Sequence, residues 1–355
     1  MGSTKAGIAA VGFCLPRYVL EAPGSEGVVQ RSAPGFDEDP ITMAVEAGER
    51  ALAAAGTRAV DVLAYATSGT AGGGALVAEA LGIDPARARD VLGSPDGGET
   101  ALAGALDAAG SGTSTLLIAT DAPEGEPHGA AAVALLVTPD GRVPWRRGTS
   151  PSLSAIRSRV GEAGAATVLL SFLTGVEPSD VRGDVDVVRA LKGRATIRPE
   201  LYEAVRRRGR SPPGTEYSQG AYVSPVTYRA EAKARYRLVG ERCTACGRLH
   251  FPPREACLGC GAAAWEDAPL RRTGTVYAFT VIGKGAAPSE FLEQQEATGE
   301  YATAVVALDD GPRVAAMLTD VEPKAVAIGM PVRMVFRRLY TQEGATRYGF
   351  KFAPA

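Results

Sequence analysis

The chain has 355 residues, of which 45% are apolar and 22% are charged, and its formal net charge is −2. This is the balance of an ordinary soluble protein that is long enough for two domains with hydrophobic cores. The balance gives no general attraction to nucleic acid or anionic membranes, and no apolar run approaches the roughly 20 residues of a membrane span, so a cytoplasmic protein is predicted.

Strand-like and helix-like segments alternate over the first 140 residues. Residues 5–15 form an apolar run typical of a buried strand, and the polar, glycine-containing segment 21–35 predicts a loop. Asp39 is a good N-cap with Pro40 at the first helical position, and apolar residues follow at helical spacing up to Gly56. Further strands are expected at 60–67, 88–92, 116–120 and 130–138, and further helices at 72–81 and 98–109. This alternation favours a layered α/β domain around a mixed or parallel sheet.

The segment from 151 to 210 adds three expected elements. We predict a helix over 153–162, a buried strand over 167–173, and a basic helix that begins at Pro199 and ends before the Ser-Pro-Pro-Gly sequence at 211–214. The basic helix carries Arg206, Arg207, Arg208 and Arg210. Guanidinium groups match phosphate oxygens, so these side chains could contact the phosphates of coenzyme A or an acidic carrier protein. A solvated helix face is the competing interpretation.

Two Cys-x-x-Cys pairs, Cys243/Cys246 and Cys257/Cys260, give the strongest local signal in the chain. Four thiolates at this spacing are typical of a closed tetrahedral site for structural zinc, or for iron in the same cage. Each pair is followed by a glycine, Gly247 or Gly261, which lets the backbone turn so that its amides approach the sulfurs. Two disulfides are the competing interpretation, which a reducing compartment disfavours. Four protein ligands leave no position for a substrate, so we expect the metal to be structural.

The fifth cysteine and the two histidines offer little for catalysis. Cys14 lies in an apolar run and is expected to be a buried, inert thiol. His250 lies between the cysteine pairs, but the four cysteines already complete a site, so a surface or packing role is expected. His128 lies in a Pro-His-Gly turn and is expected to be solvated. This scarcity limits the mechanisms that need a histidine base.

After the cysteines the pattern changes to short strands of period two. They are expected at 274–282, 301–308, 313–318, 331–339 and 346–352, which suits a small barrel of the OB type. The segment 283–299 is long for a hairpin loop and is either a binding loop or simply exposed. Arg333, Arg337, Arg338 and Tyr340 form a sparse version of the basic and aromatic pattern of single-strand nucleic-acid binders.

Short motifs in a fixed order carry a resemblance over the C-terminal 125 residues or so. They include Tyr236-Arg237-Leu238, Phe251-Pro252-Pro253-Arg254, Gly274-Thr275-Val276-Tyr277, Ile328-Gly329-Met330-Pro331-Val332 and Tyr348-Gly349-Phe350, besides the cysteine pairs. Through them this part resembles the rubredoxin-type zinc ribbons joined to OB-fold barrels that accompany thiolases and related acyl-CoA condensing enzymes. The resemblance implies an acyl-CoA-binding or bridging subunit that is not itself the catalyst.

A second resemblance covers residues 5 to about 138. It rests on Val11-Gly12-x-x-Leu15-Pro16-Arg17-Tyr18, Pro34-Gly35-Phe36-Asp37-Glu38-Asp39, Met43-Ala44-Val45-Glu46-Ala47, Ala78-Glu79-Ala80-Leu81-Gly82, Ser111-Gly112 before a strand that ends in Asp121, and Gly129-Ala130-Ala131-Ala132. These motifs resemble the first half of an archaeal-type 3-hydroxy-3-methylglutaryl-CoA synthase of the thiolase superfamily. The resemblance implies a thiolase-type fold.

The departures from that enzyme family concern its catalytic residues. Pro95, between Ser94 and Asp96, stands where the family has its nucleophilic cysteine, and Gly69 stands where it has a glutamate. The family's second half should supply a histidine and an asparagine, but no histidine lies between Asp140 and His250 and the chain has no asparagine. Ser94 or Asp96 could act as a substitute, although turn residues at a helix start are the alternative. An internal deletion that removed the active-site half explains the pattern.

These observations predict an incomplete thiolase-like α/β layered domain at 1–210, a linker and helix at 211–235, a zinc ribbon at 236–268 and an OB barrel at 269–355. The expected function is that of a non-catalytic scaffold or acyl-CoA-binding subunit that forms a hetero-oligomer with an active thiolase or ketosynthase-type condensing enzyme. The first alternative is an active enzyme that makes or breaks a carbon–carbon bond on an acyl-CoA with rearranged residues. The second is a nucleic-acid-binding ribbon and barrel.

Overall fold

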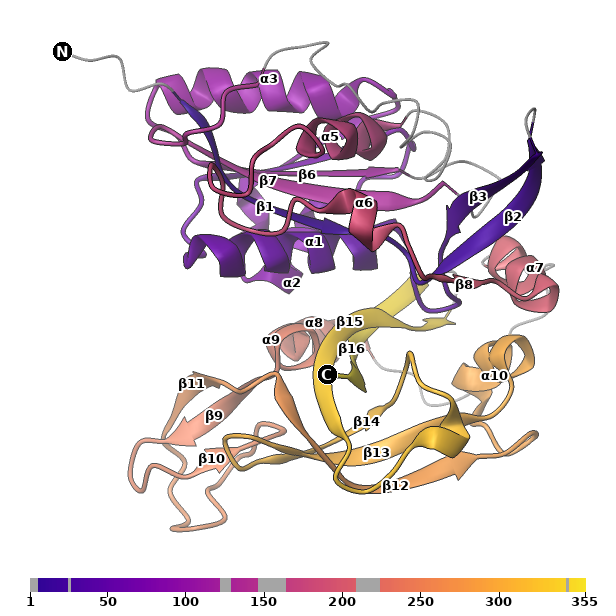
Figure 1. Ribbon diagram of the computed structural model, residues 1–355. Helices are drawn as coiled ribbons and strands as arrows, with labels where there is room; N and C mark the ends of the chain where they lie inside the picture. Colours follow the sequence, from indigo (N-terminus) through magenta and orange to yellow (C-terminus); the bar gives the residue numbers. More distant parts are fainter. Residues whose placement is uncertain (1–5, 25–26, 122–128, 146–163, 209–223, 343–344) are drawn as a thin grey trace. The chain divides into compact units, whose positions relative to one another are not determined.

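The computed structural model describes residues 6–24, 27–121, 129–145, 164–208, 224–342 and 345–355 (Figure 1). The chain divides into two compact units, Met1–Arg208 and Gly209–Ala355. The helix expected over 153–162, His128 and Arg210 lie outside the described residues. No helix in the described parts is long and apolar enough to cross a membrane.

The first unit is built around a five-stranded sheet in the order β1-β7-β6-β4-β5. Its strands are β1 (Gly7–Cys14), β4 (Val62–Thr67), β5 (Ala88–Leu92), β6 (Thr115–Asp121) and β7 (Ala131–Thr138). β4 pairs in parallel with both β5 and β6, whereas β7 is antiparallel to both β6 and β1. Nearly every residue of β1, β6 and β7 is buried, because helices cover both faces of the sheet.

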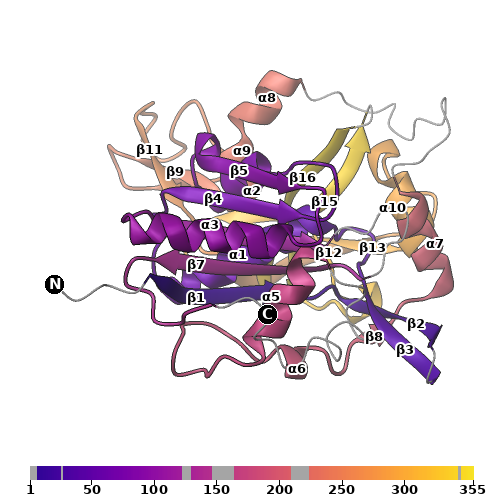
Figure 2. The same cartoon turned by 90° about the horizontal axis from the view of Figure 1, so that it is seen from above.

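The helices lie on the two faces of this sheet (Figures 1 and 2). α1 (Pro40–Ala55) and α2 (Gly74–Leu81) lie on one face, and α3 (Gly97–Gly110) and α5 (Ala165–Leu173) lie on the other. The chain also forms the short helices η1 (Pro85–Arg87), α6 (Val187–Ala190) and α7 (Pro199–Arg207). The layered α/β architecture expected from the sequence is confirmed.

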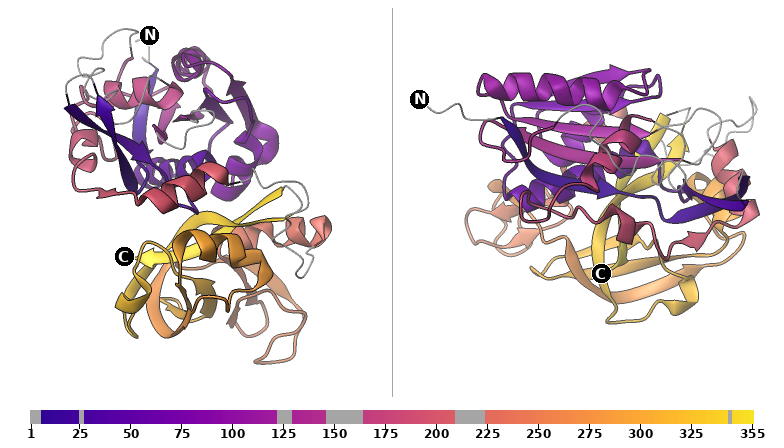
Figure 3. Two further views of the ribbon diagram at one scale, coloured as in Figure 1. Left: turned by 90° about the vertical axis from the view of Figure 1, so that its right-hand side faces the viewer. Right: turned by 45° about the horizontal axis from the view of Figure 1, so that its top comes forward.

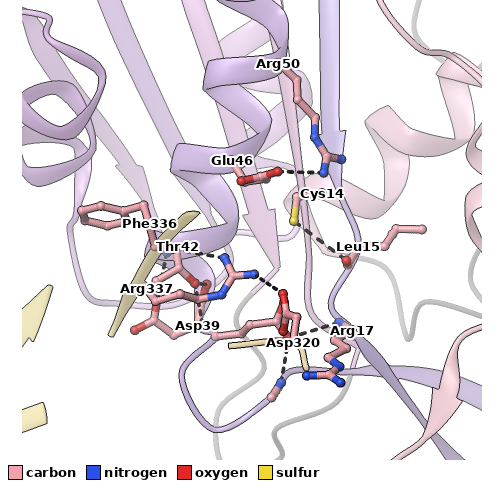
Figure 4. Close-up of polar contacts among 12 residues, drawn as sticks. Cys14, Leu15, Arg17, Asp39, Thr42, Glu46, Arg50, Asp320, Phe336 and Arg337 are labelled. Carbon is pink, nitrogen blue, oxygen red and sulfur yellow. Dashed lines mark hydrogen bonds and ion pairs between the residues drawn. The ribbon is translucent and has the colours of Figure 1, made fainter. Parts of the chain in front are cut away.

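The start of α1 shows why the sequence predicted this helix well. The Oδ1 atom of Asp39 accepts from the Thr42 N–H at 2.9 Å, and the Thr42 hydroxyl accepts from the Asp39 N–H at 2.8 Å (Figure 4). These reciprocal bonds satisfy two amides at the helix start. The helix ends at Gly56, whose φ of 71° is left-handed.

Two expectations for the first unit are wrong. Residues 167–173 belong to the helix α5 and do not form a buried strand. Seven consecutive, mostly apolar residues fit either a buried strand or a buried helix, and the tertiary contacts of the segment decide between the two. Residues 21–35 are mostly a hairpin and not a loop: β2 (Tyr18–Gly24) pairs antiparallel with β3 (Gly27–Ala33) and in parallel with β8 (Ala195–Thr196).

The packing of α3 against α5 depends on Gly98. A Cβ atom at this position would lie closer than 3.0 Å to the carbonyl oxygen of Ala165, at the start of α5. We therefore expect Gly98→Ala to lower the free energy of unfolding of the first unit by about 1–3 kcal/mol, despite the better helix propensity of alanine. Gly104→Ala is the matched control, because nothing lies within 4 Å of the added methyl group there. If urea titration showed Gly98→Ala and Gly104→Ala to be equally stable, this expectation would be wrong.

The second unit begins with two short helices and a three-stranded ribbon. α8 (Pro225–Ala230) and α9 (Ala232–Arg237) replace the single helix expected over 228–236. The ribbon has the order β10-β9-β11, with β9 (Val239–Cys243), β10 (Leu249–His250) and β11 (Trp265–Pro269). The hydroxyl of Tyr228 accepts from the Tyr348 N–H at 3.0 Å and donates to the Tyr348 carbonyl at 3.2 Å, which ties α8 to the barrel.

The five strands expected after the ribbon are all present and form a nearly closed antiparallel barrel (Figures 1 and 3). They are β12 (Thr273–Ile282), β13 (Tyr301–Leu308), β14 (Arg313–Met317), β15 (Pro331–Gln342) and β16 (Ala345–Pro354). A bridge between Leu318 and Phe352 joins the two ends of the sheet order β14-β13-β12-β15-β16. The segment 283–299 contains η2 (Ser289–Phe291) and α10 (Leu292–Thr298), and η3 (Pro323–Ala325) precedes β15.

Candidate metal centre

Two knuckle turns in the second unit bring the four cysteines together. The first follows β9 and is closed by a bond from the Gly247 N–H to the Cys243 carbonyl at 2.8 Å. The second is closed in the same way by Gly261 and Cys257 at 2.9 Å. Both glycines are left-handed, with φ values of 75° and 77°, as the predicted turns require.

The sulfur geometry fits a tetrahedral metal. The four Sγ atoms lie within 4.8 Å of one another, with 3.6 Å between Cys243 and Cys260 and 3.5 Å between Cys246 and Cys257. A zinc ion about 2.3 Å from each of four thiolates would space the sulfurs about 3.8 Å apart. All four cysteines are free thiols in the structure, so the disulfide interpretation finds no support. The donor set is therefore that of a structural zinc site.

Hydrogen bonds favour the thiolate form of Cys257, which is the form that binds a metal cation. Burial raises the pKa of the Cys257 thiol, but the N–H groups of Gly259 and Cys260, the His250 ring and Cys246 together lower it to about 5. Cys246 differs: a backbone bond from Arg248 lowers its pKa, but the neighbouring thiols raise it to about 12. A bound dication would favour the thiolate at all four positions. It would hold the two knuckles together and leave no coordination position open.

His250 is a buried packing residue next to this centre. Its Nε2 atom lies 3.3 Å from the Cys257 sulfur, and its ring packs edge-on against Trp265 at 5.1 Å between centroids. Only 5% of the residue is exposed. Of the two interpretations open from the sequence, the structure therefore supports packing and not surface exposure.

The first unit brings together the two turns in which the sequence resemblance led us to look for catalytic groups. The Gly93 N–H donates to the Gly69 carbonyl at 3.0 Å, so the turn after β4 lies beside the turn that contains Ser94, Pro95 and Asp96. The Ser94 hydroxyl accepts from the Asp96 N–H at 3.2 Å, which is the bond of a turn residue. The described part of this unit contains no histidine that could activate Ser94 as a nucleophile.

Asp121 is the group at this end of the sheet that the sequence did not single out for a role. It ends β6, is 2% exposed, and accepts from the N–H groups of Ala166 at 2.9 Å and Thr167 at 3.0 Å and from the Thr167 hydroxyl. Burial raises the pKa of this carboxyl to about 6, although these donors lower it. A carboxylate at the end of a wholly buried, mostly apolar strand is the sequence signal for such a buried anchor.

The arginine run does not form one cluster in the described residues. Arg206 and Arg207 reach Glu203 at 3.6 Å and 3.7 Å, and their side chains are 44% and 80% exposed. Arg208 instead donates to the carbonyls of Gly35 and Phe36. A contact between coenzyme A and these arginines stays a prediction.

The basic pattern on β15 is also not an exposed nucleic-acid surface. Arg337 and Arg338 are only 6% and 8% exposed. Arg337 pairs with Asp320 at 3.1 Å (Figure 4), and Arg338 donates to the Thr341 hydroxyl at 3.0 Å. Bases would need exposed aromatic rings beside accessible arginines, which this arrangement does not offer.

The second unit is similar in sequence to known protein domains. The model described as the ChsH2 rubredoxin-like zinc ribbon domain matches residues 230–266, and that described as the ChsH2 C-terminal OB-fold domain matches residues 267–337. A DUF35 domain-containing scaffold protein of Methanocaldococcus jannaschii is 38% identical over 125 residues, which are 34% of this chain and 84% of the relative. The benzoylsuccinyl-CoA thiolase subunit BbsA of Thauera aromatica is 32% identical over 89 residues, which are 25% of this chain and 56% of that subunit.

Two solved structures are also similar to parts of the chain. The Ltp2-ChsH2(DUF35) aldolase matches with 28% identity over 38% of this chain and 98% of the matched chain, at a TM-score of 0.30. MvaS in complex with 3-hydroxy-3-methylglutaryl coenzyme A matches with 20% identity over 39% of this chain and 41% of the matched chain, at a TM-score of 0.34.

Proposed function

Because the chain belongs, through its C-terminal third, to the family of DUF35 domain-containing scaffold proteins, we propose that it is a non-catalytic accessory subunit of a thiolase-type condensing or acyltransfer complex. The match to scaffold proteins is the observation that carries the proposal. The turn at Ser94, Pro95 and Asp96 supports it, since a proline ring cannot carry an acyl group. The subunit would hold an active partner enzyme in a hetero-oligomer.

One edge of the sheet in the first unit is suited to that partner. The outer side of β1 is already occupied, because Ile8 pairs with Val143 and the Arg182 N–H donates to the Ala9 carbonyl. The outer side of β5 carries no strand among the described residues, and Leu92 on this strand is 40% exposed. An exposed strand edge pairs readily with another chain. We therefore assign the partner's docking position to β5.

Coenzyme A and the cellular location belong to the same proposal. The phosphates of an acyl-CoA would contact Arg206, Arg207, Arg208 and Arg210, whose guanidinium groups suit phosphate oxygens. The cytoplasm is the compartment we propose, because thiols stay reduced and available to a metal there.

Co-expression with the condensing enzyme encoded nearest to this chain tests the proposal. Native mass spectrometry should show a hetero-complex with one metal ion per copy of this chain. Leu92→Lys should weaken that complex by about 30-fold or more, because a charge at a strand edge opposes pairing. Val28→Lys is the matched control, since Val28 is 73% exposed on β3 and lies away from β5.

The outcomes separate the alternatives. A chain that stays a well-folded monomer beside the partner contradicts the scaffold role. A complex that tolerates Leu92→Lys keeps the scaffold role but removes β5 as its docking edge. Transfer of a mass-tagged acyl group from acyl-CoA to the isolated chain would favour the active-enzyme alternative, and Ser94→Ala would then be the first variant to examine.

A further inference from the structure

A cleft of about 560 Å³ lies between the ribbon and the barrel, within the second unit. Arg242, Arg248 and Arg254 line it from the ribbon. Asp310 lines it from the turn between β13 and β14, and Arg313 lines it from the first position of β14. Four arginines and one aspartate thus line the cleft. A cleft lined mainly by positive charge concentrates negative charge, so the expected ligand is an anion.

Several of these arginines are held in place by their neighbours. Arg248 lies across Gly259, where an added Cβ atom would be 3.2 Å from the Arg248 Cδ and Nη1 atoms. The guanidinium carbon of Arg313 lies 3.6 Å from the centroid of the Tyr277 ring, a cation–π contact. Arg242 donates to the Gly247 carbonyl at 3.1 Å and lies 3.8 Å from Glu266. Side chains that are positioned before a ligand arrives lose less entropy on binding.

Other charged side chains of the cleft can still form hydrogen bonds or ion pairs with a ligand. Within the described residues, the side chains of Arg248 and Arg254 make no ion pair with a carboxylate. The Oδ2 atom of Asp310 accepts from the Arg271 N–H at 2.8 Å. The Oδ1 atom of Asp310 is buried and has no hydrogen-bond partner among the described residues. A buried carboxylate oxygen without a donor is costly. A ligand with phosphate oxygens would pair with the arginines, and an N–H or O–H donor on the same ligand would bond to the Asp310 carboxylate once this side chain turns toward the cleft.

We propose that this cleft binds the phosphate groups of a nucleoside phosphate, with Asp310 accepting a hydrogen bond from its sugar or base. Arginine forks match the paired oxygens of phosphate better than they match a single carbonyl or hydroxyl group. Free nucleotides and the nucleotide end of coenzyme A share this chemistry. The inference goes beyond the scaffold role, because binding would occur in the isolated chain without any partner.

Isothermal titration calorimetry of the full-length, zinc-loaded chain tests the proposal, with ADP, coenzyme A, dephospho-coenzyme A and inorganic pyrophosphate as separate probes. At least one nucleotide should bind with a dissociation constant below about 1 mM at low salt, and added salt should weaken it. Arg248→Ser and Arg254→Ser should each weaken binding by about tenfold or more. Arg229→Ser on α8, an exposed arginine outside the cleft, should leave it unchanged.

Zinc content is measured for each variant, so that loss of the ribbon is distinguished from loss of a contact. Arg313→Ser provides a second test on the barrel side, away from the cysteines, and should also weaken binding. Tight binding of coenzyme A with weak binding of dephospho-coenzyme A and ADP would identify coenzyme A as the source of the phosphate. No binding by any probe, or unchanged binding in the arginine variants, would overturn the proposal. Pyrophosphate that binds as tightly as every nucleotide would overturn the assigned role of Asp310.

Discussion

Replacement of Cys243 by serine is expected to abolish stoichiometric metal binding and to unfold the ribbon. Cys243 ends β9, is fully buried, and lies 3.6 Å from the Cys260 sulfur, so its loss removes one corner of the tetrahedron. Structural zinc in small ribbons contributes an apparent free energy of about 10–16 kcal/mol, which is folding free energy for a segment with so little core of its own. Hydrogen exchange should show that β9, β10 and β11 lose their protection.

The barrel should be affected only where the ribbon packs against it. Leu249 and Phe251 follow the first knuckle and pack against the barrel core around Val276 and Phe352. The barrel strands themselves should keep most of their protection, because their pairing does not involve the cysteines.

Cys14→Ala is the matched control for the cysteine prediction. Cys14 is a buried cysteine of the first unit and is not part of the four-sulfur cluster, so this variant should still bind one metal ion per chain. Inductively coupled plasma mass spectrometry gives the metal content, and a zinc chelator should reproduce the Cys243→Ser exchange pattern in the unmodified protein. A ribbon that stays fully protected without metal would contradict a structural metal.

The elements that the sequence predicted correctly are those with local signals. The capping box of α1, the two cysteine pairs and the alternating barrel strands each involve residues a few positions apart. The hairpin of β2 and β3 and the helix α5 depend on distant residues. β8 pairs with β2 from more than 170 positions along the chain, and Asp121 bonds to the start of α5 from 45 positions away. No window of neighbouring residues contains this information.

The same distinction applies to the candidate sites. The four sulfur ligands of the metal centre could be named from the sequence, because two Cys-x-x-Cys pairs at this spacing are typical of a zinc ribbon. The arginine cleft was not, since Arg248 and Arg313 come from segments that meet only when the ribbon packs against the barrel. The arginine run on α7 was conspicuous in the sequence, but the fold turns Arg208 back onto the first unit.

Asp121 should make the first unit lose stability as the pH rises from about 4 to 6. Its pKa is raised from 3.8 to about 6 in the fold by burial, so in this window the folded state binds more protons than the unfolded state. The stabilisation by the protonated carboxyl is fully present below pH 4 and is lost as the pH rises through 6. A difference of about two pKa units corresponds to about 3 kcal/mol. Above pH 7 the effect should be constant.

Asp121→Asn removes this titration and keeps one acceptor for the start of α5. Urea titrations followed by Trp145, in a background with Trp265→Phe, should therefore show that the stability of the unmodified protein relative to this variant falls by about 3 kcal/mol between pH 4 and 7. Thr167→Val should move the window to higher pH, because the Thr167 hydroxyl bond lowers the Asp121 pKa. Parallel stability curves for the unmodified protein and Asp121→Asn would contradict this prediction, because they would show that the pKa of Asp121 is the same in the folded and unfolded states. In that case, Asp121 would be ionised in the fold above about pH 4, and the donors at the start of α5 would offset the cost of burying its charge.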